Sequence, residues 1–216
     1  MPNVLIINGH QPYRVSQGRL NASFAQAAND VFRDCGWQVR RCASAEPFDI
    51  DTQVENQLWA DLIFLQFPLN SMGLPWSLKK YLDEVYTAGM DGRLAKGDGR
   101  SRSDLSRQYG SGGLMGDTAY ALSLTLNAPR AAFDDPDQML FAGRSLDELL
   151  APIHINFAFF GLHALETFAA YDVTKAPQIK SDIERFKTHL GAMADRVERN
   201  DFQPSDTTRP RQGTSG

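Results

Sequence analysis

Apolar residues along the chain follow two kinds of pattern in turn. Short, almost wholly apolar runs at residues 4–8 and 62–67 have the length and composition of buried strands. Between them, apolar residues recur at helical spacing from Leu20 to Phe32, and Gly36 is placed to end that helix. This alternation of strand and helix patterns indicates a parallel sheet covered by helices.

The rest of the chain continues the alternation, with one interruption. We expect a weak strand at 38–40, a brief helix around Val54 and Leu58, a helix at 77–86 with Pro75 just inside its first turn, a strand at 121–126, a helix at 145–161, a strand at 164–168 and a helix at 177–199. Residues 87–116 are rich in Gly, Asp, Arg and Ser, and a loop of that length is usually functional. The sequence predicts one α/β domain over residues 1–200, with five parallel strands between two helix layers, and a disordered tail at 201–216.

Composition narrows the classes of function. The 216 residues carry a net charge of −4, whereas a nucleic-acid-binding domain would be strongly basic. No apolar run approaches the roughly 18 residues of a membrane helix, and the N-terminus lacks a signal-peptide pattern. Cys35 and Cys42 have no histidine pair near them, so we expect no metal site. We expect a cytoplasmic protein with reduced thiols, no nucleic-acid partner and no membrane span.

Polar loops follow the three strands that we expect to flank the switch point of the sheet, which are the first, third and fourth. Ligands of such sheets bind beyond the carboxyl ends of the strands at that point. The loops read GHQPYRVSQGRLN, PLNSMGLP and TLNAP. In the first loop, small polar residues meet the start of a helix, where free backbone N–H groups attract an anion; they are Ser16, Gly18, Asn21 and Ser23. A phosphate cradle is one interpretation, and ordinary helix capping is the other.

The second and third loops suit a flat heteroaromatic ring. Asn70 and Met72 in one loop, with Thr125 and Asn127 in the other, combine apolar contact with a few hydrogen-bonding groups. Each loop alone also fits an ordinary turn between a strand and a helix. Neither G-x-x-x-x-G-K-[ST] nor G-x-G-x-x-G occurs in the first loop, and the glycine-rich YGSGGLMG precedes a strand. No G-x-S-x-G elbow supports a hydrolase.

Taken together, these motifs resemble the flavodoxin-like NAD(P)H:quinone oxidoreductases of the bacterial "modulator of drug activity B" type. The resemblance runs from Val4 to about Leu190 and rests on LIING, SQGRLN, LWAD, QFPLNSMGLPW, KKYLDEV, DGRSR, YGSGG, LSLTLNAP and APIH. It implies a flavodoxin-like three-layer fold, bound FAD (with FMN possible), NADPH as hydride donor and a quinone acceptor reduced by two electrons. It also implies a homodimer whose sites include residues of the partner chain. The helix at 145–161 is either part of that interface or an internal core helix.

The resemblance also assigns roles to residues. The FAD diphosphate would lie against His10, Ser16, Gly18, Leu20, Asn21 and Ser23. The flavin ring would lie against Pro68, Leu69, Asn70, Ser71 and Met72 on one side, and Thr125, Leu126, Asn127 and Ala128 on the other. Tyr109 would lie near both the FAD and the acceptor.

Two residues are candidate catalytic donors to the developing charge on a quinone oxygen, with Tyr109 first and His154 second. His154 lies in an apolar helix, where a hydrogen-bonded core histidine is the competing interpretation. His10 has a similar alternative, as a loop histidine held by backbone groups. The arginines of the long loop are candidates for the 2′-phosphate of NADPH, or simply solvated charges; they are Arg100, Arg102 and Arg107.

Two positions depart from the pattern of many relatives, which carry aromatic side chains where this chain has Ser71 and Leu126. Smaller residues there imply a roomier acceptor pocket and leave the acceptor open. The alternatives are an FMN-dependent azo- or nitroreductase, a biosynthetic reductase of a bulky aromatic quinone, and a non-enzymatic flavin-binding electron carrier or sensor. The mild net charge and the long loop argue against a carrier.

Overall fold

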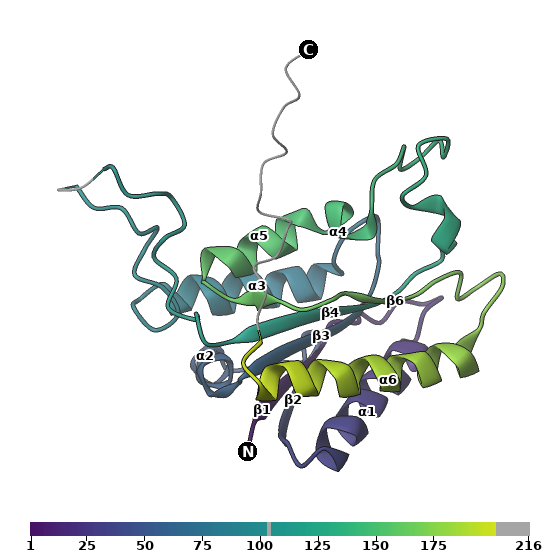
Figure 1. Ribbon diagram of the computed structural model, residues 1–216, viewed down its shortest axis with the longest axis horizontal. Coiled ribbons are helices and arrows are strands. Elements are labelled where there is room, and N and C mark those ends of the chain that lie inside the picture. Colours follow the sequence, from purple (N-terminus) through teal and green to yellow (C-terminus); the bar gives the residue numbers. More distant parts are fainter. Residues whose placement is uncertain (103–104, 202–216) are drawn as a thin grey trace.

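A computed structural model describes residues 1–102 and 105–201 of the chain (Figure 1). Its strands form one parallel sheet: β1 (Asn3–Asn8), β2 (Gln38–Ala43), β3 (Leu62–Pro68), β4 (Ala119–Thr125), β5 (His163–Ala164) and β6 (Phe168–Ala170). Their order is β2-β1-β3-β4-β5, and β6 also pairs with β4. The predicted parallel α/β sheet is therefore confirmed.

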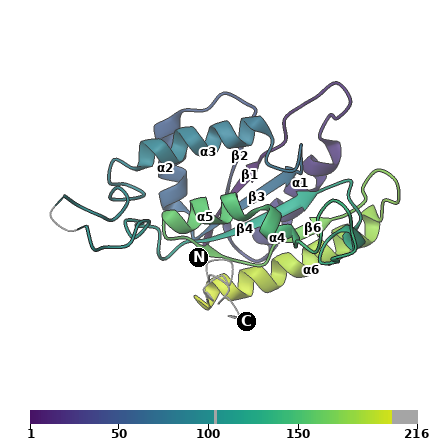
Figure 2. The ribbon, with the colours of Figure 1, turned by 90° about the horizontal axis from the view of Figure 1, so that it is seen from above.

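Helices cover both faces of this sheet (Figures 1 and 2). Residues of α1 (Arg19–Asp34) and α6 (Ile179–Glu198) share one core with one side of the strands. Residues of α2 (Ile50–Trp59), α3 (Trp76–Gly89), α4 (Leu146–Leu149) and α5 (Ala151–Phe159) share a second core with the other side. A short 3₁₀ helix, η1 (Arg130–Ala132), follows β4.

The buried apolar runs explain why the sheet has two covered faces. Successive side chains of a strand point to opposite faces. In β1, Leu5 and Ile7 belong to the core beneath α3 and α5, whereas Val4 and Ile6 belong to the core beneath α1 and α6. Strand β4 is buried along its whole length. A strand that is apolar on both sides needs a helix layer on each face.

Several boundaries differ from the predictions. The expected single helix at 145–161 is two helices, α4 and α5, because the chain leaves helical geometry at Leu150. Pro152, which has no N–H group, lies in the first turn of the second helix. The expected strand at 164–168 is two short strands, β5 and β6, which pair with opposite ends of β4. Pro75 precedes α3 as its N-cap and is not inside its first turn.

Two elements are longer than predicted. Strand β2 extends to Ala43, and α3 extends to Gly89 at the start of the expected long loop. Apart from Asp201, the predicted tail lies outside the described residues, so the division into one domain and a tail stays a prediction. In the described part of the chain, no helix is both long enough and apolar enough to span a membrane.

Candidate cofactor-binding site

The three polar loops lie side by side at one edge of the sheet. Parallel pairing of β1 with β3 and of β3 with β4 brings the carboxyl ends of these strands together, with Asn8 opposite Gln66 and Pro68 opposite Thr125. Backbone hydrogen bonds continue past the strands, from the Gly9 N–H to the Gln66 carbonyl at 2.8 Å and from the Leu69 N–H to the Thr125 carbonyl at 2.9 Å. The fold therefore brings the three loops together, as the sequence predicted.

The first loop ends at an open helix N-terminus. Tyr13 and Ser16 exchange two backbone hydrogen bonds, of 2.9 and 3.0 Å, and Gly18 then enters α1 in the left-handed conformation with φ of 70°. Within the described residues, no side chain caps α1, and its first turn holds no acidic residue. The N–H groups and the positive dipole end of the helix are thus left for an anion.

His10 lies directly against this helix start. A Cβ atom added to Gly18 would lie 2.3 Å from the His10 Nδ1, so the imidazole occupies space that only glycine leaves free. The His10 residue is 8% exposed, and its Nε2 is buried with no hydrogen-bond partner among the described residues. Burial lowers the pKa of His10, and a hydrogen bond with the Ser16 backbone partly offsets this. A free imidazole nitrogen beside an uncapped helix fits a phosphate oxygen.

The other first-loop residues divide into exposed and buried ones. Ser16 and Ser23 are exposed, and the Ser23 hydroxyl donates to the Arg19 carbonyl at 3.0 Å. Leu20 is half-buried. Asn21 is 2% exposed, and its amide is hydrogen-bonded to side chains of β1 and β3. Any contact of Asn21 with a ligand would therefore use its backbone N–H.

The second loop contains a strained two-residue turn. Asn70 and Gly73 exchange backbone hydrogen bonds of 3.0 and 2.9 Å across it. The two residues between them, Ser71 and Met72, have φ of 47° and 64°. This left-handed region is unfavourable for residues with a side chain, and such strain is concentrated at functional sites. The turn comes after Pro68 and Leu69, beyond the carboxyl end of β3.

The third loop is tied to the segment after β6. The Leu126 N–H donates to the Ala170 carbonyl at 3.0 Å, and the Ala128 carbonyl accepts from the Asp172 N–H at 3.1 Å. The Asn127 side-chain oxygen accepts a hydrogen bond from the Thr174 hydroxyl. Thr125 and Leu126 are both buried, with Leu126 in the core under α4 and α5. Of the two departures from the family pattern, only Ser71 is therefore exposed.

Tyr109 is not brought to these loops within one chain. It is 70% exposed and follows α3, whose fourteen residues span about 21 Å. Figures 1 and 2 place the long loop after α3 at the opposite end of the sheet from the loop between β1 and α1. Arg102 and Arg107 belong to this distant loop. Arg100 is there as well, paired with Asp98 and lying over the Tyr109 ring.

His154 is buried between α5 and the sheet. Its Nδ1 lies 2.6 Å from the Tyr120 hydroxyl, and its Nε2 lies 3.4 Å from a carboxylate oxygen of Asp147. The nearby His154 imidazole lowers the pKa of Asp147. The Nδ1 is therefore paired with a core side chain, whereas the Nε2 lies near the half-exposed Asp147 and has no hydrogen-bond partner among the described residues. The pairing of Nδ1 with Tyr120 favours the core-histidine interpretation over a catalytic one.

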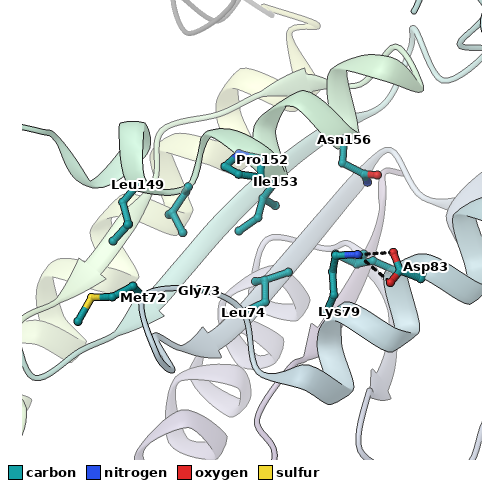
Figure 3. Close-up of a pocket in the computed structure, with 11 residues that line it drawn as sticks. Met72, Gly73, Leu74, Lys79, Asp83, Leu149, Pro152, Ile153 and Asn156 are labelled. Atoms are coloured by element: carbon teal, nitrogen blue, oxygen red, sulfur yellow. Dashed lines mark hydrogen bonds and ion pairs between the residues drawn. The ribbon is translucent and has the colours of Figure 1, made fainter.

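A groove between α3 and α5 was not anticipated from the sequence. One hollow of about 450 Å³ begins at Met72 and is lined mainly by apolar side chains of α3, α4 and α5 (Figure 3). A second, of about 410 Å³, reaches Tyr109, and the two share Leu82, Asp83, Pro152 and Asn156. The groove thus connects the second loop with Tyr109.

The middle of this groove contains an unsatisfied amide. The Asn156 Nδ2 is buried and has no hydrogen-bond partner among the described residues. Figure 3 shows Asn156 on the wall opposite the ion pair of Lys79 with Asp83, whose closest atoms are 2.5 Å apart. The only signal in the sequence was a polar residue in a largely apolar helix, which does not reveal a groove.

Comparison with known proteins decides the family. A family model described as a flavodoxin-like fold matches residues 2–193. The chain belongs to this flavodoxin-like family. It is 40% identical over 187 residues to an uncharacterized protein of Schizosaccharomyces pombe, covering 87% of this chain and 94% of that protein. It is 35% identical over 188 residues to NADPH:quinone oxidoreductase MdaB of Haemophilus influenzae, covering 87% of this chain and 97% of that protein.

Solved structures agree on the fold of this flavodoxin-like protein. A putative quinone reductase from Klebsiella pneumoniae superposes with a TM-score of 0.72 at 18% identity, over 94% of this chain and 87% of that chain. At this identity the likeness concerns the fold alone. Both the predicted flavodoxin-like fold and the predicted family are confirmed.

Proposed function

We propose that the protein is an FAD-dependent NAD(P)H:quinone oxidoreductase that holds its flavin at the loops after β1, β3 and β4. One observation carries the cofactor site: the unpartnered His10 Nε2 beside the uncapped start of α1. The family relationship with a protein named NADPH:quinone oxidoreductase supports the reaction. Together these favour an enzyme over a carrier or sensor.

The two ends of the cofactor would meet different groups. The diphosphate would accept hydrogen bonds from the first N–H groups of α1 and from the His10 Nε2, with Gly18 leaving room for the imidazole. The turn of Ser71 and Met72 and the third loop would hold the flanks of the flavin ring. When bound, the flavin supplies hydride transfer from NAD(P)H and two-electron reduction of the acceptor. The chain contributes position and exclusion of water.

We further propose that the working unit is a homodimer. In a dimer with two-fold symmetry, the same surface region of both chains forms the contact. If two grooves face each other, the Tyr109 end of one chain meets the Met72 end of its partner. The exposed Ile155 would then be covered. Tyr109 would reach the site in the partner chain, where its hydroxyl donates to the acceptor oxygen as charge develops.

The acceptor class remains a proposal that rests on pocket size. Ser71 is exposed and small at the turn beside the groove. This favours an aromatic quinone of more than one ring, which fits a hollow of about 450 Å³. The preference for NADPH and the cytoplasmic location stay predictions from the sequence.

The first experiment identifies the cofactor. The purified protein is examined for a yellow flavin spectrum, and the flavin released on denaturation is identified by chromatography. Anaerobic NADPH should bleach the spectrum, and menadione should restore it. Released FMN would favour the azo- or nitroreductase alternative, and a protein that takes up no flavin would refute the proposal.

A second experiment tests the dimer. Ile155→Glu should convert the protein to a monomer in light scattering, because it buries a charge in the contact. Leu58→Glu is the control, since Leu58 is also an exposed apolar helix residue but lies on α2, outside the groove. Unchanged mass for Ile155→Glu would contradict the proposed contact. Tyr109→Phe should lower kcat and leave flavin binding and mass unchanged.

A further inference from the structure

A buried network of hydrogen bonds lies beneath the first and second loops of the proposed cofactor site. The Ser123 hydroxyl on β4 donates to the Gln66 Oε1 on β3 at 2.7 Å. The Gln66 Nε2 donates to the Asn21 Oδ1 on α1 at 3.0 Å. The Asn21 Nδ2 donates to the Asn8 Oδ1 on β1 at 2.6 Å, and the same oxygen accepts from the His10 backbone N–H at 3.1 Å. These hydrogen bonds therefore link β4 to the His10 loop through β3, α1 and β1.

Gln66 is the centre of this network. It has no exposed surface, and its backbone carbonyl also accepts from the Gly9 N–H at 2.8 Å. Gln66 therefore contacts the first loop through its backbone and the start of α1 through its side chain. Two residues after Gln66, β3 ends at Pro68, and the strained turn of the second loop follows.

A buried amide is a costly way to provide stability alone. Burying a polar group is unfavourable unless its hydrogen bonds are complete, and an apolar residue could pack in its place. Apolar packing has no preferred direction, whereas the hydrogen bonds of an amide that donates on one side and accepts on the other require a set direction and distance. Such a group fixes where α1 begins relative to β3.

We propose that Gln66 is a positioning residue for the cofactor: through Asn21 and Asn8 it holds the helix start and His10 at a set distance from the flavin loop. Gln66 contacts neither the diphosphate nor the ring. The inference rests on the proposed function, because it assumes that these loops hold FAD. Loss of Gln66 should weaken FAD binding by more than its effect on the fold explains.

The test compares two glutamines that differ in location only. Gln66→Met keeps the length of the side chain and removes both hydrogen bonds. Gln57→Met is the matched control, since Gln57 is also fully buried, donating to the Tyr81 hydroxyl at 3.0 Å and accepting from the Tyr86 hydroxyl at 3.1 Å. Gln57 joins α2 to α3, outside the three loops.

Two quantities are measured for each variant after the flavin has been removed. Thermal unfolding of the flavin-free protein reports stability, and quenching of FAD fluorescence during titration reports the dissociation constant. We expect similar losses of Tm in the two variants. We expect a rise of roughly tenfold to a hundredfold in the FAD dissociation constant for Gln66→Met alone.

The outcomes separate the inference from the proposed function. Equal FAD affinity in the two variants, with wild type binding FAD, overturns the positioning role alone. Wild-type protein that takes up no FAD overturns the proposed function and the inference with it. If Gln66→Met does not fold, Ser123→Ala replaces it, because it removes only the donor to Gln66. It should weaken FAD binding severalfold, and wild-type affinity for that variant would overturn the inference.

Discussion

Gly18→Ala tests whether His10 and the helix start form one anion site. Gly18 has φ of 70°, and an added Cβ would lie 2.3 Å from the His10 Nδ1. The substitution therefore does two things: it places a side chain in a left-handed conformation, and it displaces the imidazole. Gly36→Ala does only the first, because Gly36 has φ of 83° and nothing within 4 Å of an added Cβ.

The two effects have different sizes and different readouts. The left-handed conformation costs about 1–2 kcal/mol in either variant, which for a chain of this length lowers Tm by about 2–8 °C. Displacement of His10 removes one hydrogen bond to a charged group, about 1.5–3 kcal/mol. That loss corresponds to roughly a tenfold to hundredfold weaker FAD binding, in Gly18→Ala alone.

The assay pairs thermal unfolding of the flavin-free variants with FAD titration. A His10→Ala background completes a double-mutant cycle, in which Gly18→Ala and Gly36→Ala should bind FAD equally, because the displaced group is absent. Equal FAD affinity of the two glycine variants in the wild-type background would refute the argument. It would mean that His10 does not contact the cofactor, whatever the stability change.

Three further predictions follow from particular residues. Because burial lowers the pKa of His10, its neutral form stabilises the flavin-free protein above about pH 6.5, and that contribution is lost as the pH falls. His10→Gln should therefore flatten the dependence of Tm on pH, leaving the part due to His189, whose pKa is also lowered by burial. An unchanged dependence of Tm on pH would contradict this. Tyr120→Phe leaves the His154 Nδ1 buried without its partner and should cost about 1–3 kcal/mol in denaturant unfolding with FAD affinity unchanged; weaker FAD binding would instead link this pair to the site. Ser71→Trp should narrow the range of quinones reduced while FAD stays bound, and an unchanged range in steady-state kinetics would show that Ser71 does not set pocket size.

The chain by itself determined the sheet and the placement of three polar loops at one edge of it. The apolar runs at 4–8 and 62–67 are long enough and apolar enough to require burial on both sides, which demands a parallel sheet between helix layers. Parallel strands place their carboxyl ends together, so polar loops after three neighbouring strands predict one shared site. The sheet is confirmed, because its prediction uses local periodicity and general rules of topology, and the shared site stays a prediction.

The partners of the polar side chains were decided by the tertiary structure. Asn21 lies at a position in the sequence that is typical of a capping or phosphate-binding residue. Its amide instead pairs with Gln66, which is 45 positions away along the chain. His154 pairs with Tyr120 across 34 positions. Tyr109 lies near the C-terminal end of α3, away from the loops it was expected to join. Periodicity along a chain reports which face of an element is buried, whereas the group met on that face depends on how distant elements pack.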